Sequence, residues 1–277
     1  MRPSHTVLFA VASLLSIAAH DVAAHDAAAQ EDHHCPHSQP RNLQLDLTGV
    51  KAVVFDIGPH NLRVNASANA RGAVQGKACS SDEQELPLLT LTQERSGDKL
   101  LIRAQREQIQ NGFFKDTASL GRHLFGNHYS YLTLNADIPE GMPVQLKVGS
   151  GDAVVVGATS LSADVGSGDV QARGIRGLVE AHVGSGDIEL DDIGELKVRS
   201  VGSGDISVRR IARGAEVKSV GSGSVELQTV GGNVDVGSIG SGDLDVRDVR
   251  GALSVRSVGS GSVDHSAVAG GVSLPEQ

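Results

Sequence analysis

Short runs of alternating apolar and polar residues fill the chain from residue 146 to residue 270. In Ile206-Ser207-Val208, a polar residue lies between two apolar ones, and the same order recurs in the neighbouring segments. Alternation with a period of two is typical of a β-strand that buries one face. A further apolar residue, Ile211 in this segment, follows nine positions after Gly202. The pattern predicts short strands with inward Val, Ile and Leu side chains and outward polar ones.

The turn sequence Val-Gly-Ser-Gly-Asp, at residues 201–205, recurs nearly unchanged seven times. Its first glycines lie 17 to 19 residues apart, at Gly149, Gly166, Gly184, Gly202, Gly221, Gly240 and Gly259. A fixed period just under twenty residues is typical of a solenoid, in which each repeat is one coil that stacks on the next. Glycine pairs and β-branched residues disfavour helix. The sequence therefore predicts an all-β, single-stranded, β-helix-like β-solenoid with coils of 17–19 residues.

Two glycine turns per coil are expected to join its two strands. A corner that is repeated in every coil requires either a positive φ or a close approach of two backbones, and glycine permits both. No coil can bury its apolar face alone, so neighbours stacked about 4.8 Å apart bury it together. This solenoid is expected at residues 146–270, followed by a short tail at 271–277.

Residues 1–24 have the composition of a secretory signal peptide. Arg2 gives a positively charged start, residues 7–19 are largely apolar, and Ala23 and Ala24 are small residues suited to cleavage. The apolar stretch is too short to cross a membrane as a helix, and no later stretch is long enough. We expect an exported mature chain without a transmembrane segment, in the periplasm, at the outer envelope or secreted.

A polar, histidine-rich leader is expected at residues 25–40. The candidate metal ligands in it are His25, His33, His34, Cys35 and His37. Their spacing matches no closed zinc site, so a solvated N-terminal segment is the alternative interpretation.

The two cysteines of the chain, Cys35 and Cys79, are expected to form a disulfide. Two cysteines in an exported chain most often pair with each other. Such a bond would tie the leader to the following segment and add about 3–4 kcal/mol of stability in the chain-entropy model.

Residues 41–145 are expected to form a strand-rich cap. Residues 53–64 follow the repeat pattern with Gly-Pro-His-Asn in place of Gly-Ser-Gly-Asp, which indicates a degenerate coil. Residues 88–92 and 99–102 flank a Ser-Gly-Asp turn and predict a hairpin. Terminal repeats of a solenoid are atypical because they cover an open edge.

An insertion at residues 103–130 interrupts the pattern. It holds most of the aromatic residues of the mature chain: Phe113, Phe114, Phe125 and Tyr129. These side chains either plug the end of the solenoid or form a partner contact on a loop carried by a rigid scaffold.

Composition and charge exclude some classes of function. The net charge of −9 argues against nucleic-acid binding, which usually needs a basic surface. A polysaccharide-cleaving β-helix needs clustered catalytic groups and aromatic sugar platforms, whereas this chain has no Trp and only 3% aromatic residues. The Gly-Ser-Gly tripeptides are repeated turns and lack the Gly-x-Ser-x-Gly nucleophile motif. We expect no catalytic residues.

Stacking places the residue after each Gly-Ser-Gly turn in one ladder. The acidic members of this ladder are Asp152, Asp169, Asp187, Asp205 and Asp243, with serine at the same place in two coils. One interpretation is a calcium site between coils, as in the Gly- and Asp-rich calcium-binding nonapeptide repeats. The other is that Asp and Ser cap backbone N–H groups of the turn, which needs only an oxygen and explains why the two residues interchange.

The succession of Val-Gly-Ser-Gly-Asp coils after a strand-rich, cysteine-containing segment resembles the putative-adhesin family of bacterial β-strand-repeat proteins. It is also similar to the head domains of auto-transporter adhesins. The resemblance covers roughly residues 41–270 and rests on the repeat. It implies a β-solenoid of the bacterial cell envelope and supplies no catalytic residues.

These observations together indicate a non-catalytic, exported scaffold or adhesion module. Its expected partner is a protein or glycan of the envelope or cell surface, and no cofactor is expected. The alternatives are a calcium-dependent surface-binding module and, third, a polysaccharide-active enzyme.

Overall fold

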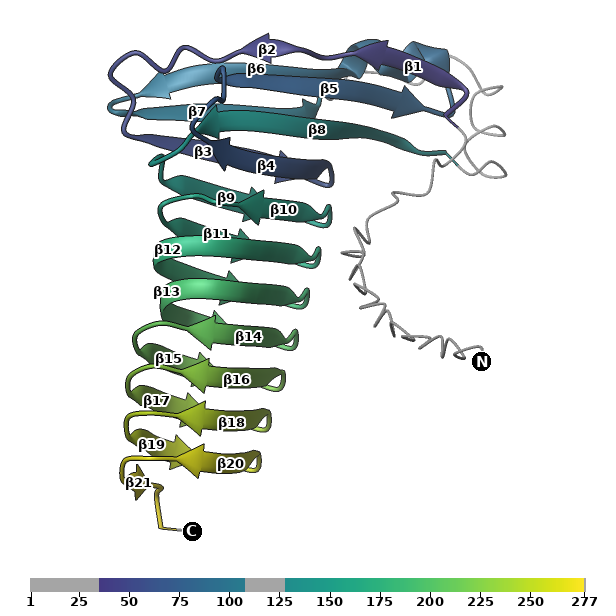
Figure 1. Ribbon diagram of the computed structural model, residues 1–277. Coiled ribbons are helices and arrows are strands. Elements are labelled where there is room, and N and C mark those ends of the chain that lie inside the picture. Colours follow the sequence, from purple (N-terminus) through teal and green to yellow (C-terminus); the bar gives the residue numbers. More distant parts are fainter. Residues whose placement is uncertain (1–34, 108–127, 277) are drawn as a thin grey trace, which may run out of the picture. The chain divides into compact units, whose positions relative to one another are not determined.

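The computed structural model describes residues 35–107 and 128–276. Residues 1–34, which include the predicted signal peptide, and residues 108–127 of the predicted insertion lie outside this description. The described chain is almost entirely β, and its coils stack in parallel from β9 to β21 (Figure 1). The predicted β-solenoid is confirmed.

Two stacks of strands form the two broad faces of the solenoid. The strands of the first, here called the β3 face, are β7 (Lys99–Arg106), β3 (Ala52–Gly58), β9 (Val144–Val148), β11 (Leu161–Val165), the second halves of β12 (Val170–Val183) and β13 (Ile188–Val201), β15 (Ala215–Val220), β17 (Val234–Ile239), β19 (Leu253–Val258) and β21 (Val272–Ser273).

The strands of the opposite face, here called the β4 face, are β8 (Ser130–Pro139), β4 (Asn61–Ser67), β10 (Ala153–Val156), the first halves of β12 and β13, β14 (Ile206–Ile211), β16 (Ser224–Val230), β18 (Asp243–Val249) and β20 (Ser262–Val268). All of these pairings are parallel. Each residue therefore faces the equivalent residue of the next coil, as Ile188 faces Ile206.

The core is a stack of inward-pointing aliphatic side chains between the two faces. Ile206, Val208 and Ile211, which the alternation predicts to point inward, are each no more than 2% exposed. The matching positions of the other coils are buried as well, with exposures of up to 3% at Ala172. The last coil is the exception, because Val263 and Val268 are half-buried and His265 is exposed. Because each coil adds only a few small side chains, the core gains its area by repetition.

The Gly-Ser-Gly corner owes its glycines to close backbone approach. None of these glycines has a positive φ. A Cβ on the second glycine would instead overlap the carbonyl oxygen of its counterpart in the preceding coil, as Gly204 would overlap Gly186. The approach is so tight because the serine N–H donates to the first glycine of the preceding coil, for example Ser203 to the Gly184 carbonyl at 2.8 Å.

The second corner of most coils holds the glycines that the sequence predicts. A Cβ on Gly194 would come within 2.0 Å of the Arg176 carbonyl oxygen, and one on Gly231 within 2.2 Å of the Ala212 carbonyl oxygen. A left-handed residue lies beside these glycines. It is itself glycine in the early coils, at Gly157 and Gly174, and it is Asp192, Arg210, Thr229, Asp248 or Ala267 in the later ones, with φ between 53° and 59°. These five side chains are accommodated at the local cost of a positive φ.

The cap is built out of chain order. The coil made of β3 and β4 lies between the coil made of β7 and β8 and the coil made of β9 and β10, although β3 and β4 come first in the chain (Figure 1). The predicted hairpin is confirmed: β6 (Leu89–Ser96) pairs antiparallel with β7. On the other face β5 (Ala73–Ser80) pairs antiparallel with β8.

Two short strands and one 3-10 helix complete the cap. They are β1 (His37–Pro40), β2 (Leu43–Gln44) and η1 (Glu83–Leu88). Both strands pair antiparallel with β5, and Leu86 and Leu89 are buried beneath them. Arg41, which lies between β1 and β2, joins these strands to the end of η1. Its guanidinium donates to the Leu89 carbonyl at 2.7 Å and to the Leu86 carbonyl at 2.6 Å.

Cys35 and Cys79 form the predicted disulfide. It fixes the start of the described chain beside β5, where Ser38 pairs with Cys79. The leader consequently ends earlier than residue 40, since His37–Pro40 is the strand β1. The insertion is likewise shorter than 103–130, because β7 continues to Arg106 and β8 begins at Ser130. At the other end, Val272–Ser273 continues the stack as β21 instead of forming only a tail.

His60 is a buried polar residue at the first corner of the β3–β4 coil. It is 1% exposed, and its Nδ1 accepts the N–H of Leu132 at 3.2 Å. Within the described residues its Nε2 has no hydrogen-bond partner. Burial lowers the pKa of His60 from 6.5 to about 4, because the charged imidazolium cannot be solvated there.

We predict that Gly204→Ala strongly destabilises the protein, because the new methyl group and the Gly186 carbonyl cannot both keep their positions. The melting temperature, followed by circular dichroism, should fall by several degrees or more. Gly271→Ala is the matched control, since nothing lies within 4 Å of a Cβ at that glycine. Equal melting temperatures for the two variants would contradict this account of the corner.

The pKa of His60 predicts a loss of stability in mild acid. The unfolded chain takes up a proton below pH 6.5, whereas folded His60 resists protonation until about pH 4. The free energy of unfolding should therefore fall between pH 6.5 and pH 4 by roughly 3 kcal/mol from this residue. Urea unfolding at a series of pH values measures it. His60→Gln should flatten this part of the profile, and a change at the exposed His265 should not.

Candidate functional site

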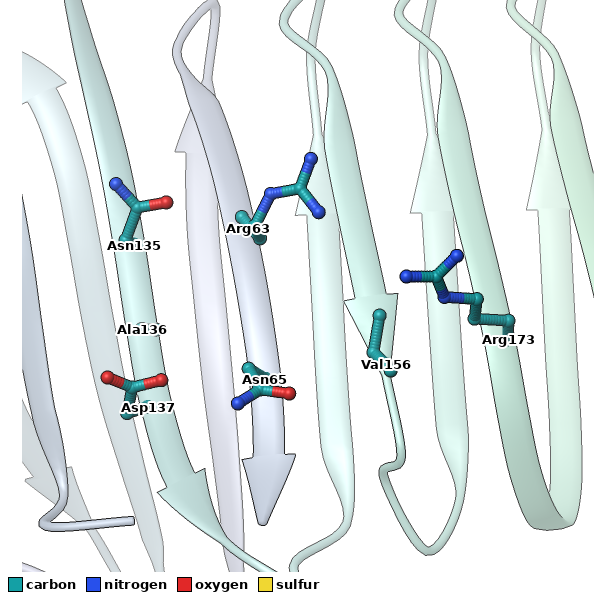
Figure 2. A pocket seen from close by; sticks show the side chains of 7 residues that line it. All are labelled: Arg63, Asn65, Asn135, Ala136, Asp137, Val156 and Arg173. Atoms are coloured by element: carbon teal, nitrogen blue, oxygen red, sulfur yellow. The ribbon is translucent and has the colours of Figure 1, made fainter. Parts of the chain in front are cut away.

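A shallow depression of about 320 Å³ lies on the β4 face, near its cap end. It is lined by Arg63, Asn65, Asn135, Ala136, Asp137, Val156 and Arg173 (Figure 2). These residues come from four neighbouring strands, β8, β4, β10 and β12, which are held in register by parallel pairing. The solenoid thus fixes the spacing of side chains that are up to about 110 positions apart in the chain.

The depression exists because β10 breaks the outward polar pattern. Its outward residues are Val154 and Val156, both half-buried, whereas the strands on either side carry longer polar side chains at the paired positions. Val154 lies level with Arg63, and Val156 lies level with Arg173. The short valines leave a hollow with an apolar floor between two rows of polar residues.

Arg63 and Arg173 border this hollow from opposite sides. Figure 2 shows their guanidinium groups leaning toward each other across β10. Within the described residues, neither guanidinium has an ion-pair partner. Asp191 is opposite Arg173 in the ladder, but its carboxylate is bound to Arg210. The hollow therefore has two cations that are free to meet an anion.

The strands β8 and β4 supply the depression with neutral and acidic side chains that can form hydrogen bonds. Asn135 and Asp137 project from β8, and Asn65 projects from β4 at the level of Asp137. All three side chains are exposed. Amides donate and accept, and a carboxylate accepts, so the site offers both kinds of partner to a polyhydroxylated ligand.

Most other basic residues of the coils are neutralised. Arg213 pairs with Glu195 at 3.2 Å, Lys197 with Glu216 at 3.5 Å, and Arg247 contacts both Glu226 and Asp245. The depression was not among the sites that the sequence predicts. A signal was present, because residues 153–156 read Ala-Val-Val-Val, where the other coils place a polar residue between the apolar ones.

The aspartate ladder has a structural role in the described coils. The Oδ1 atom of each aspartate accepts the backbone N–H of the next ladder residue, as Asp187 accepts from Asp205 at 3.0 Å. The remaining distances in this series are 3.2 Å for Asp152 to Asp169, 3.2 Å for Asp169 to Asp187, 2.8 Å for Asp205 to Ser224 and 3.2 Å for Asp243 to Ser262. Asn61 begins the ladder by accepting from Asp152 at 3.1 Å.

Serine in the ladder changes the partner of the next coil. After Ser224, the N–H of Asp243 donates to the Gly223 carbonyl at 3.2 Å instead of to a side chain. The ladder residues of β16 and β18 therefore join the strands, which begin one residue earlier than in the preceding coils. The aspartates of the ladder therefore cap backbone N–H groups of the next coil, whereas Ser224 does not, so capping does not explain why serine replaces aspartate at that position. In the described residues no group of three or more His, Cys, Asp or Glu side chains is arranged to hold a metal ion.

The remaining predicted site residues divide between described and undescribed parts. Phe113, Phe114 and Phe125 lie outside the described residues, as do His25, His33 and His34. Tyr129 immediately precedes β8, and its ring centroid is 6.1 Å from that of Tyr131. Cys35 is in the disulfide, so it is not a metal ligand.

One serine–histidine pair on the β3 face escaped the sequence analysis. Ser200 Oγ and His182 Nδ1 are 2.6 Å apart, because a register shift between β12 and β13 places Ser200 opposite His182. Nucleophilic catalysis would also require free backbone donors for an oxyanion. The N–H groups here belong to strands paired on both sides, so we interpret the pair as a cross-strand hydrogen bond.

Comparison with protein families finds one match. Residues 175–269, 95 of the 277 residues, match the family model described as putative auto-transporter adhesin, head GIN domain. The resemblance that the repeats indicate is thereby confirmed over these coils. A search of curated proteins found no match.

Solved structures that the comparison matches to this chain include a putative lipid binding protein from Parabacteroides distasonis. It is 18% identical, with a TM-score of 0.50, over 86% of this chain and 97% of that one. A putative adhesin from Parabacteroides merdae is 15% identical, with a TM-score of 0.37, over 83% of this chain and 96% of that one. A putative cell adhesion protein from Clostridium sporogenes is 12% identical, with a TM-score of 0.30, over 87% and 100%. The first of these supports the fold.

We predict that calcium does not stabilise the coils, because the ladder carboxylates already accept N–H groups. The melting temperature should be equal in excess EDTA and in millimolar calcium. Asp205→Asn keeps the acceptor and should be neutral, whereas Asp205→Val leaves the Ser224 N–H unpaired and should cost about 1 kcal/mol. A calcium-dependent rise in melting temperature that is lost in Asp205→Asn would establish the metal interpretation instead.

Proposed function

We propose that this protein is an exported, non-catalytic module that binds a macromolecule of the cell envelope or cell surface. The observation that carries the proposal is the match of residues 175–269 to an adhesin head domain. The β-solenoid suits this role because its rigid faces present regular rows of outward side chains over a long surface.

Two further observations support an extracytoplasmic location. The Cys35–Cys79 disulfide is of the kind that persists in oxidising compartments. Residues 1–24 have the pattern of a signal peptide. Among residues 35–107 and 128–276, no helix is long and apolar enough to cross a membrane. We propose the periplasm, the outer envelope or the surrounding medium as the site of action.

Binding without chemistry fits the surface that the coils present. The outward residues are mostly charged and polar side chains, and many of them are engaged in ion pairs between neighbouring strands. The aromatic residues Phe113, Phe114 and Phe125 remain a second proposed contact region. A calcium-dependent mode of binding is the alternative proposal, and the EDTA comparison distinguishes it.

Envelope binding is tested with the mature chain, residues 25–277, immobilised and incubated with separated glycan and protein fractions of envelope extracts. We expect saturable retention of one fraction and recovery of that fraction chemically unchanged. The heat-unfolded chain is the control for nonspecific adsorption. Failure of every envelope fraction to bind, or turnover of a retained polysaccharide that a single point substitution abolishes, would refute the proposal.

A further inference from the structure

We propose that the depression bordered by Arg63 and Arg173 is a binding subsite for an acidic glycan, one whose sugar units carry carboxylates. This inference deepens the proposed envelope-binding function and rests on it. It follows from three features that coincide at β10: two unneutralised guanidinium groups, an apolar floor, and amide and carboxylate groups along one side.

The positions of the guanidinium groups suit a ligand that lies across β10. Arg63 and Arg173 are two strands apart, roughly 10 Å along the stack, and two residues apart along the strands, roughly 7 Å. Both side chains lean toward the space between them. A guanidinium donates two parallel hydrogen bonds to a carboxylate, so each arginine can bind one carboxylate in a bidentate manner.

The apolar floor and the other polar side chains of the depression favour a ligand whose carboxylate is carried by a sugar. Val156 presents methyl groups to the hollow, on which the C–H face of a pyranose ring can pack. Asn65 and Asn135 can donate to and accept from hydroxyl groups. Asp137 is an acceptor only, so it fits hydroxyl donors and repels anions.

Asp137 and the net charge together make a nucleic acid or other densely charged polyanion a poor ligand. The chain carries a net charge of −9, and the depression itself has two positive groups and one negative group. A ligand with one carboxylate per sugar unit can direct its charges to the arginines and its hydroxyl groups to Asp137. A phosphodiester group is negatively charged and carries no donor, so Asp137 repels it.

The volume limits how much of a glycan one subsite holds. About 320 Å³ is at the lower end of the range for small-ligand sites, which is room for one or two sugar units. The open depression leaves the rest of the chain to run over the β4 face. We therefore expect weak affinity for an oligosaccharide and a larger effective affinity for a polymer that meets several copies of the protein.

The test uses the mature chain and titrates it with a trimer of galacturonic acid, by isothermal calorimetry and by shifts of the backbone amide signals in NMR spectra. The fully methyl-esterified trimer keeps the sugars and removes the charges. Inorganic phosphate and a triglutamate peptide offer anions without sugars. We expect saturable binding of the acid trimer with signal changes at β4, β10 and β12, and binding at least tenfold weaker for the other three probes.

Arg63→Gln and Arg173→Gln should each weaken binding of the acid trimer about tenfold or more, because each removes a charge-assisted hydrogen-bonding group. Arg209→Gln is the matched control. Arg209 is exposed on β14 of the same face, has no ion pair within the described residues and does not line the depression. This variant changes the net charge equally and should keep the affinity of the unsubstituted protein.

A third variant tests the floor. Val156→Glu places a carboxylate between the two guanidinium groups and should abolish binding while leaving the melting temperature nearly unchanged, since Val156 is an outward residue. Equal weakening by Arg209→Gln would overturn the proposal in favour of nonspecific attraction. Binding of phosphate or triglutamate as tight as that of the acid trimer would show an anion site that is not for glycans.

The two proposals can fail separately. Retention of an envelope fraction that does not change in Arg63→Gln or Arg173→Gln would leave the envelope-binding function standing and refute this subsite. Saturable binding of the acid trimer with no retention of any envelope fraction would support the subsite and remove the proposed function.

Discussion

Contact between the backbones of successive glycines sets the geometry of every coil. A carbonyl of one coil occupies the space that a Cβ of the next would need, at Gly168, Gly186, Gly204 and the equivalent residues. Hydrogen bonds from the serine N–H groups hold the coils at this distance. The register of both faces follows from this contact, because it allows only one alignment of each coil on its neighbour. In that alignment apolar residues face apolar residues, as Ile188 faces Ile206 and Ile206 faces Val225. The thin core and the outward rows both depend on this contact.

The two corners of the coil differ in what they permit. The Gly-Ser-Gly corner excludes side chains from both of its glycines. The opposite corner accommodates Asp, Arg, Thr and Ala at its left-handed residue, but close backbones still exclude a side chain at glycines such as Gly194 and Gly231. Variation in sequence can therefore accumulate at the left-handed residue of the second corner and at the outward strand positions without altering the stack. The depression at β10 is an instance: two outward valines in place of polar residues produce a hollow while the ladder of β4, β10 and β12 continues unbroken.

Features that repeat were predictable from the sequence, and features that occur once were largely not. Ile206, Val208 and the glycine corners could be assigned because seven copies reveal the same period, and the Cys35–Cys79 pair followed from there being only two cysteines. The chain order of the cap could not be read, because the interposed coil of β3 and β4 resembles any other degenerate repeat. The neutral, buried state of His60 could not be predicted either, because it depends on how this residue packs beneath β8. The arginines of the depression look ordinary in the sequence, since only the ladder brings Arg63 and Arg173 to either side of Val156.

The interposed coil of the cap has a consequence for the order of folding. As the chain emerges from its N-terminus, β3 and β4 appear early but find no lasting partner until β7 and β8 arrive on one side and β9 and β10 on the other. These contacts span long sequence separations and close slowly. Every later coil contacts residues that emerged only 17 to 19 positions before it. Completion of the cap is thus the slow nucleating event, after which the solenoid can lengthen coil by coil.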